Sequence, residues 1–87
     1  MRFTVVWNPS AESQLAEIWL KSNDRAGVSH AANAIEHELG RSPRTVGESR
    51  FGDRRVAIVL PLAVHFTVDD ADRIVRVLSV RQVEREK

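Results

Sequence analysis

The sequence predicts an α+β fold in which two helices pack on one face of a small sheet. Two observations predict it. A short β-favouring run and two segments with helical apolar spacing occupy the first half of the chain, and three further β-favouring runs occupy the second half. Because a helix and a sheet that are each apolar on one side must cover those sides, the simplest arrangement packs the helices against the sheet. A chain of 87 residues is long enough for one core, so we expect a single domain spanning residues 1–87.

The first predicted elements are a strand and a helix. Residues 3–7 are rich in β-branched and aromatic side chains, which favour a strand. Asn8 can then cap a helix, and Pro9 can occupy its first position without losing a hydrogen bond. Helical spacing places an apolar stripe on one face of about three turns, made of Ala11, Leu15, Ile18, Trp19 and Ser22.

A second predicted helix completes a hairpin. Asn23 and Asp24 end the first helix and offer a second cap. Apolar residues then recur at helical intervals from Val28 to Leu39, and a glycine follows. Residues 40–49 contain two glycines and a proline among polar side chains, so they are predicted to be a loop.

Three β-favouring runs follow, at residues 54–60, 62–68 and 73–80. Their connections are short, which predicts a three-stranded antiparallel meander. In the middle run apolar residues alternate with smaller or polar ones, which indicates one face packed on the core and one face open. In the last run the apolar residues do not share one parity, which predicts either burial on both faces or a bulge.

Charge is divided unevenly along the chain. The first 39 residues carry three basic and five acidic side chains, whereas the rest carry ten basic and seven acidic ones. Nearly all the basic residues of the second half are arginines, which suit bidentate contact with carboxylate or phosphate groups. We therefore expect an anionic partner for the second half.

Several classes of function lack support in the sequence. The chain has no cysteine, so it has neither disulfides nor thiolate metal sites. His30 and His37 lie seven residues apart and lack the four-residue spacing of a metal pair, so no metal is expected. No glycine loop of the phosphate-binding type occurs, and we expect no cofactor. The absence of a secretion signal and of a long apolar stretch predicts a cytoplasmic protein with no membrane partner.

His65 and the arginines of the meander are the candidate functional residues. By strand parity His65 lies on the open face, where an imidazole can serve in acid–base chemistry, although a half-exposed strand histidine without a role is the favoured interpretation. Arg54 and Arg55 point to opposite faces, so one is expected to pair locally while the other meets a target. The remaining candidates either extend this anion-binding patch or keep strand edges soluble; they are Arg50, Arg76 and Arg81.

Other conspicuous residues receive structural interpretations. Trp7 and Trp19 are expected to be core anchors rather than a binding platform. Ser10 and Ser79 have no histidine and carboxylate partner in a motif of the hydrolase type.

The chain as a whole resembles a known family. The residues that support this are Trp7, Pro9-Ser10-Ala11, Leu15, Ile18, Ala32, Ile35, Leu39, Pro43, Gly47, Arg54 or Arg55, and the blocks at residues 64–68 and 73–80. Their order and spacing resemble the RelE/ParE superfamily of toxins from bacterial type II toxin–antitoxin systems. The resemblance implies a growth-inhibiting protein that is held inactive by a cognate antitoxin, which wraps the toxin with a helix and a strand.

The family resemblance implies two target classes. RelE-like members cleave messenger RNA at the ribosome with basic residues and often a tyrosine, whereas ParE-like members act on DNA gyrase. This chain has no tyrosine, Ala63 stands where a basic residue is expected, and Gln82 and Val83 stand at the expected basic pair. These departures favour a ParE-like binding inhibitor over an enzyme.

Two rival interpretations stay open. One is a metal-independent ribosome-dependent mRNA endonuclease in which the catalytic residues are His65 and Arg81. The other is a degenerate homologue that only binds a partner. In each case the antitoxin is expected to cover an apolar groove or a sheet edge, namely the first strand or the strand that starts at Arg54.

Overall fold

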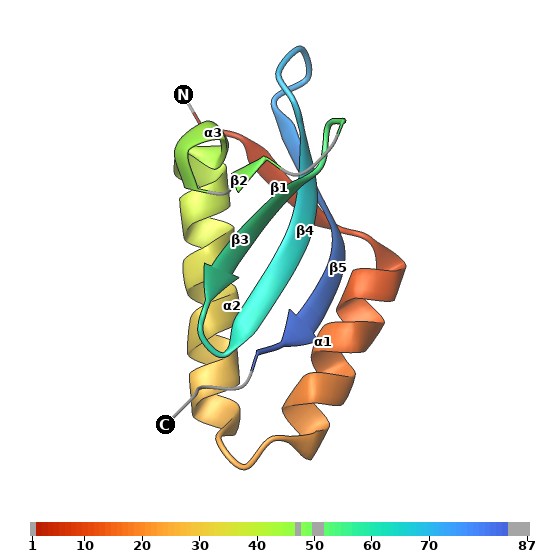
Figure 1. The fold of residues 1–87 in the computed structure, drawn as a ribbon, viewed down its shortest axis with the longest axis vertical. Coiled ribbons are helices and arrows are strands. Elements are labelled where there is room, and N and C mark those ends of the chain that lie inside the picture. The colour runs from red at the N-terminus through yellow and green to blue at the C-terminus, as the bar shows by residue number, and fades with distance from the viewer. Residues whose placement is uncertain (1, 47, 50–51, 84–87) are drawn as a thin grey trace.

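The computed structural model describes residues 2–46, 48–49 and 52–83, and it confirms the α+β prediction (Figure 1). The elements in chain order are β1 (Thr4–Trp7), α1 (Pro9–Lys21), α2 (Arg25–Arg41), α3 (Pro43–Val46), β2 (Glu48–Ser49), β3 (Arg55–Val59), β4 (Leu62–Asp69) and β5 (Ile74–Gln82). In Figure 1 the strands β3 and β4 cross in front of α2, so the helices cover one face of the sheet, and the other face carries no helix among the described residues. Neither long helix in the described ranges has the continuous apolar stretch that a membrane span requires.

The strands form one mixed sheet in the order β1-β5-β4-β3-β2. β3, β4 and β5 are the predicted antiparallel meander, whereas β1 lies parallel to β5. Parallel pairing requires a long connection between the strands, and the helical hairpin is the first part of that connection. The last strand of the meander, β5, therefore lies beside the first strand of the chain, β1.

One of the two predicted sheet edges is confirmed, and the other is an edge over only part of its length. β1 is an edge strand, as expected. The strand that begins near Arg54 is covered over part of its length, because β2 pairs with it at Val56 and Arg55. Beyond those two pairs the outer side of β3 has no described strand, and its neighbouring residues Ile58 and Leu60 are 57% and 45% exposed.

The last strand contains the bulge that its uneven parity indicated. His65 pairs with Ser79 and the next residue, Phe66, pairs with Val77, so Leu78 is the extra residue. The bulge lets Val77 and Val80 both face the core, although they are three positions apart.

The helix starts agree only in part with the predicted caps. Asp24 caps α2, since its side chain accepts a hydrogen bond of 3.0 Å from the Gly27 N–H. Asn8 occupies the N-cap position of α1, but its side chain makes no capping hydrogen bond, so that part of the prediction is wrong. Pro9 fixes the first turn instead, because its backbone angle already suits a helix.

The segment at residues 40–49 is more ordered than the predicted loop. α2 continues through Gly40 to Arg41, a single helical turn follows as α3, and the two-residue strand β2 comes next. Gly40 is buried, and its carbonyl accepts a hydrogen bond of 2.7 Å from the Phe3 N–H. A Cβ at Gly40 would lie 3.4 Å from the Phe3 carbonyl oxygen, so a small residue allows the chain to enter β1 closely against α2.

The core lies between the helices and the covered face of the sheet. Its fully buried members come from both helices and all three meander strands; they are Ala11, Val28, Ala31, Ile35, Leu39, Ala57, Leu62, Val64, Phe66, Val75, Val77 and Val80. No polar or charged side chain among the described residues is buried with them. Apolar burial is therefore the main source of stability, at about 25 cal/mol per Å² removed from water.

This core predicts a contrast between two isoleucines, one buried in α2 and one exposed in β3. Ile35→Val should lower the free energy of unfolding by about 1 kcal/mol, because Ile35 is 1% exposed and the lost methyl leaves a cavity. Ile58→Val should change it by less than about 0.5 kcal/mol, because Ile58 is 57% exposed. Urea denaturation of both variants checks this, and equal losses would contradict the assigned core.

Candidate functional site

The open face of the sheet is ordered in cross-strand rows. On β4 the residues Ala63, His65 and Thr67 alternate with the core residues and so face away from the helices. Their partners on β5 are Arg81, Ser79 and Arg76 respectively. Successive rows lie about 7 Å apart, since each skips one residue along the strand.

His65 and Ser79 form the middle row. His65 Nδ1 and Ser79 Oγ lie 3.3 Å apart, and both side chains are half-buried. The contact holds the imidazole against β5, and a hydroxyl can donate to or accept from it according to the tautomer. Ser79 was expected to lack a histidine and carboxylate pair of the hydrolase type; the structure gives it a histidine neighbour alone. The pairing was hidden because it depends on the register across the Leu78 bulge.

The two flanking rows carry the arginines of β5. Arg81 lies opposite Ala63, and Arg76 lies opposite Thr67, on either side of the His65 row. Both arginines are exposed. A ligand that spans the face along β5 would therefore meet a guanidinium, the imidazole and a second guanidinium in turn.

The surroundings of the two arginines differ. Arg76 lines a hollow of about 390 Å³ together with three carboxylates, which are those of Asp53, Asp69 and Asp70. Nearby carboxylates reduce the positive potential that an anionic ligand would feel. Asp70 also forms an ion pair with Arg44, which connects this hairpin tip to α3. Arg81 stands at the opposite end, away from that acidic hollow, so the half of the face around Arg81 and His65 is the more favourable one for an anion.

Arg54 and Arg55 have different environments, as the alternation of a strand requires. Arg55 lies on the covered side, opposite Phe66, and its guanidinium Nη2 donates a hydrogen bond of 2.8 Å to the Arg44 carbonyl. Arg54 is exposed just before β3, and continuing the register places it beside Thr67 on the open face. Arg55 therefore holds α3 against the sheet, and Arg54 joins the row of Arg76. Arg50 lies outside the described residues.

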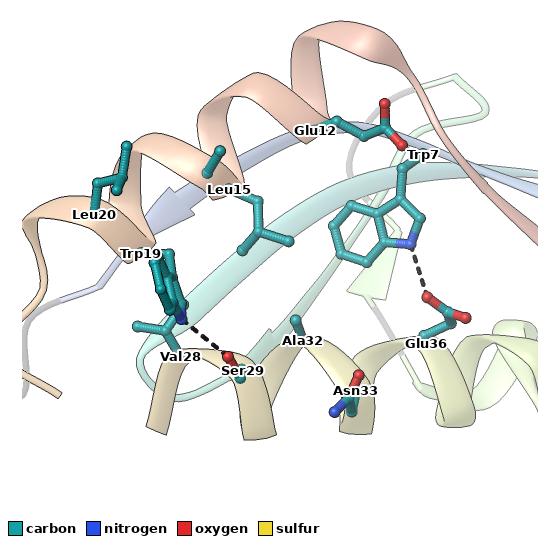
Figure 2. A pocket seen from close by; sticks show the side chains of 11 residues that line it. Trp7, Glu12, Leu15, Trp19, Leu20, Val28, Ser29, Ala32, Asn33 and Glu36 are labelled. Atoms are coloured by element: carbon teal, nitrogen blue, oxygen red, sulfur yellow. Dashed lines mark hydrogen bonds between the residues drawn. The ribbon is translucent and has the colours of Figure 1, made fainter. Parts of the chain in front are cut away.

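A second surface feature is a groove of about 770 Å³ between the two long helices (Figure 2). Trp7 and Trp19 both line it. The expectation that both are core anchors is wrong for Trp19, which is 38% exposed, and it holds for Trp7 only on the side that packs against the core. Helical spacing identified the apolar stripe but did not show that α1 and α2 separate at their outer sides.

Comparisons with known proteins identify the fold. No family model and no curated protein matches the sequence. The structure is similar to that of the toxin–antitoxin complex RelBE2 from Mycobacterium tuberculosis, with a TM-score of 0.79, 19% identity and coverage of 94% of this chain and 92% of that chain. It is also similar to the chromosomal ParDE system from P. aeruginosa, with a TM-score of 0.72, 15% identity and coverage of 94% and 97%. A further similarity is to TrmO from Pseudomonas aeruginosa, with a TM-score of 0.63 and 28% identity, where 92% of this chain matches 35% of that one.

The two neighbouring arginines of β3 allow a direct test of the site geometry. Arg55→Ala should lower the free energy of unfolding by about 1 kcal/mol, because it leaves the Arg44 carbonyl without its donor. Arg54→Ala should leave stability within about 0.5 kcal/mol of the parent, because Arg54 is exposed. Thermal unfolding followed by circular dichroism measures both. A larger loss for Arg54→Ala than for Arg55→Ala would mean that the roles are reversed.

Proposed function

The chain has the fold of the RelE/ParE toxins, and from this fold we propose that it is the toxin component of a type II toxin–antitoxin system. It inhibits bacterial growth from the cytoplasm as a single domain and is neutralised by a cognate antitoxin protein. Solved complexes of the same fold are toxin–antitoxin pairs, which supports an antitoxin as the partner.

The proposed mode of action is ParE-like, that is, binding to DNA gyrase without catalysis. The observation that carries this is the open sheet face, where exposed arginines from β5 and from the segment before β3 lie in the rows on either side of a single imidazole; they are Arg54, Arg76 and Arg81. Guanidinium groups on a rigid sheet present fixed donors to carboxylates or phosphates. The chain has no tyrosine, so the face lacks a phenol for proton transfer or for stacking on a base.

A second candidate function is cleavage of messenger RNA at the ribosome. It is favoured by one observation, the half-buried His65 fixed by Ser79 in the row next to Arg81. RNA cleavage requires a base for the 2′-hydroxyl, an acid for the leaving oxygen and a cation for the phosphorane charge. His65 can fill one proton-transfer role and Arg81 the cationic one. The second proton-transfer role has no evident group among the described residues of these rows, which is why the binding mode is preferred.

The experiment that tests the proposal is inducible expression of the chain alone in bacteria. Growth is scored while gyrase supercoiling and cell-free translation are assayed in parallel with the purified protein. We expect growth arrest and loss of supercoiling with translation intact. Blocked translation with message cut at the ribosome would instead establish the nuclease, and normal growth would identify a homologue that only binds a partner.

Removal of the arginines should separate target binding from folding. The triple variant Arg54→Ala, Arg76→Ala, Arg81→Ala should raise the concentration needed for half-inhibition of supercoiling by about tenfold or more, because each charged hydrogen bond contributes about 1.5–3 kcal/mol. The matched control removes three exposed basic residues away from the open-face rows and should keep full potency; it combines Arg2→Ala, Lys21→Ala and Arg41→Ala. Equal potency of the two variants would exclude the open face as the target site.

His65 distinguishes the binding mode from the nuclease. His65→Gln keeps a side chain that hydrogen-bonds to Ser79 but cannot transfer protons near neutral pH. We expect it to inhibit growth as the parent does. A loss of growth inhibition with unchanged thermal stability would support the nuclease and contradict the binding mode.

A further inference from the structure

The outer side of β5 is held by two different elements along its length. β1 pairs with it from Ile74 to Val77 and so fixes the part that carries Arg76. No described strand pairs with the outer side of residues 78–82, the part that carries Arg81. The helix α1 packs beside β5 and bonds to this second part instead. The half of the open face that is more favourable for an anion therefore depends on a helix that lies on the covered side of the sheet.

Two side chains of α1 bond to the backbone on either side of Ser79. Gln14 Oε1 accepts a hydrogen bond of 2.8 Å from the Val80 N–H. Ser10 Oγ donates a longer one, of 3.4 Å, to the Leu78 carbonyl. The Leu78 carbonyl belongs to the peptide group that precedes Ser79, and the Val80 N–H belongs to the peptide group that follows it. Both peptide groups around Ser79 are therefore attached to α1.

The bulge in β5 gives these two bonds a further consequence. β4 and β5 change register at this point, so Leu78 has no partner on β4. An extra residue interrupts the ladder, and a slip by one position turns every following side chain to the other face. Such a slip would turn Arg81 toward the covered side and bring Val80 onto the open face. The bond from the Val80 N–H to Gln14 opposes that slip, since it fixes the direction of this peptide group.

Protection of the strand edge does not by itself account for this placement. A helix side chain anywhere along residues 78–82 would hinder pairing with another chain. The two bonds instead meet the peptide groups that flank Ser79, whose side chain contacts the imidazole of His65 on the open face. The anchored point of β5 is thus the point at which the middle row of the open face is built.

We infer that Gln14 is a positioning residue of the open face, with Ser10 in the same role at a longer distance. Through the backbone of β5, Gln14 holds Ser79 against His65. The same bond holds Arg81 in the neighbouring row. The inference rests on the proposed function for the use of this face as a target site, whereas the position of Ser79 is a property of the chain alone.

His65 reports the position of Ser79. Its Nδ1 lies 3.3 Å from Ser79 Oγ, and a hydrogen bond to one ring nitrogen influences which tautomer a neutral imidazole adopts. Nitrogen chemical shifts of the ring, measured by NMR at mildly alkaline pH, give that tautomer. The other two histidines of the chain, His30 and His37, are exposed on α2 and serve as internal references.

A set of variants at position 14 tests the positioning role. Gln14→Met removes the acceptor with little change in length or helix preference. We expect it to shift the His65 tautomer toward that of Ser79→Ala, which lacks the hydroxyl, and to leave the two reference histidines unchanged. Gln14→Glu keeps an acceptor oxygen and should keep the parent tautomer. Ser13→Ala, an exposed change on the same helix, should keep it as well.

The same spectra contain the results that would overturn the inference. One is a His65 tautomer in Gln14→Met that equals the parent's, and another is a tautomer that does not move in Ser79→Ala. An equal displacement of the reference histidines would mean general loosening and would contradict positioning. If Gln14→Met does not fold by circular dichroism, Ser10→Ala replaces it and should shift the tautomer in the same direction by a smaller amount.

The consequence for target binding is measured separately. Gln14→Met should raise the concentration needed for half-inhibition of supercoiling by about three- to tenfold, because the lost hydrogen bond lets Arg81 leave its row. Gln14→Glu should restore the parent value. Full potency of Gln14→Met with a shifted His65 tautomer would overturn the role in target binding. If the parent chain does not inhibit gyrase, the proposed function fails, while the NMR comparison still decides whether Gln14 positions Ser79.

Discussion

Strand β5 is the element on which the other parts of the molecule depend. It pairs with β4 along one side and with β1 along the other, and α1 packs against it. β1 covers only the first part of its outer side, from Ile74 to Val77. Beyond that point α1 takes over, because Gln14 Oε1 accepts a hydrogen bond of 2.8 Å from the Val80 N–H and Ser10 Oγ donates one of 3.4 Å to the Leu78 carbonyl. A strand edge that would otherwise invite aggregation is thereby covered by helix side chains.

This arrangement explains why the molecule has two different surfaces. Both helices must lie on the side of β5 and β4 that carries Val64, Phe66 and Val77, since burial of these side chains drives the packing. The other side of the same strands, against which no described helix packs, presents His65, Arg76 and Arg81. The bulge at Leu78 affects both surfaces, because it sets the register of β5. It keeps Val77 and Val80 in the core while Ser79 remains opposite His65.

The acidic and basic halves of the sequence contribute to different surfaces of the molecule. The acidic first half builds the helices, and its carboxylates Glu12 and Glu36 line the groove between them. The arginine-rich second half builds the meander and its open face.

The sequence by itself determined the elements that depend on local chemistry. The helical spacing of the apolar residues predicted the hairpin, together with Pro9 at one helix start and the Asp24 cap at the other. The alternation of apolar residues predicted the meander and its covered face, and the uneven parity of the last strand indicated the bulge. Only the tertiary structure decided what depends on distant segments meeting. Two of these features belong to the sheet, namely the parallel pairing of β1 with β5 and the contact of Ser79 with His65. The others are the hydrogen bond from Arg55 to the Arg44 carbonyl and the groove between α1 and α2 at Trp19. Each of them is set by register or by the packing angle of whole elements, and neither quantity is encoded in the identity of neighbouring residues.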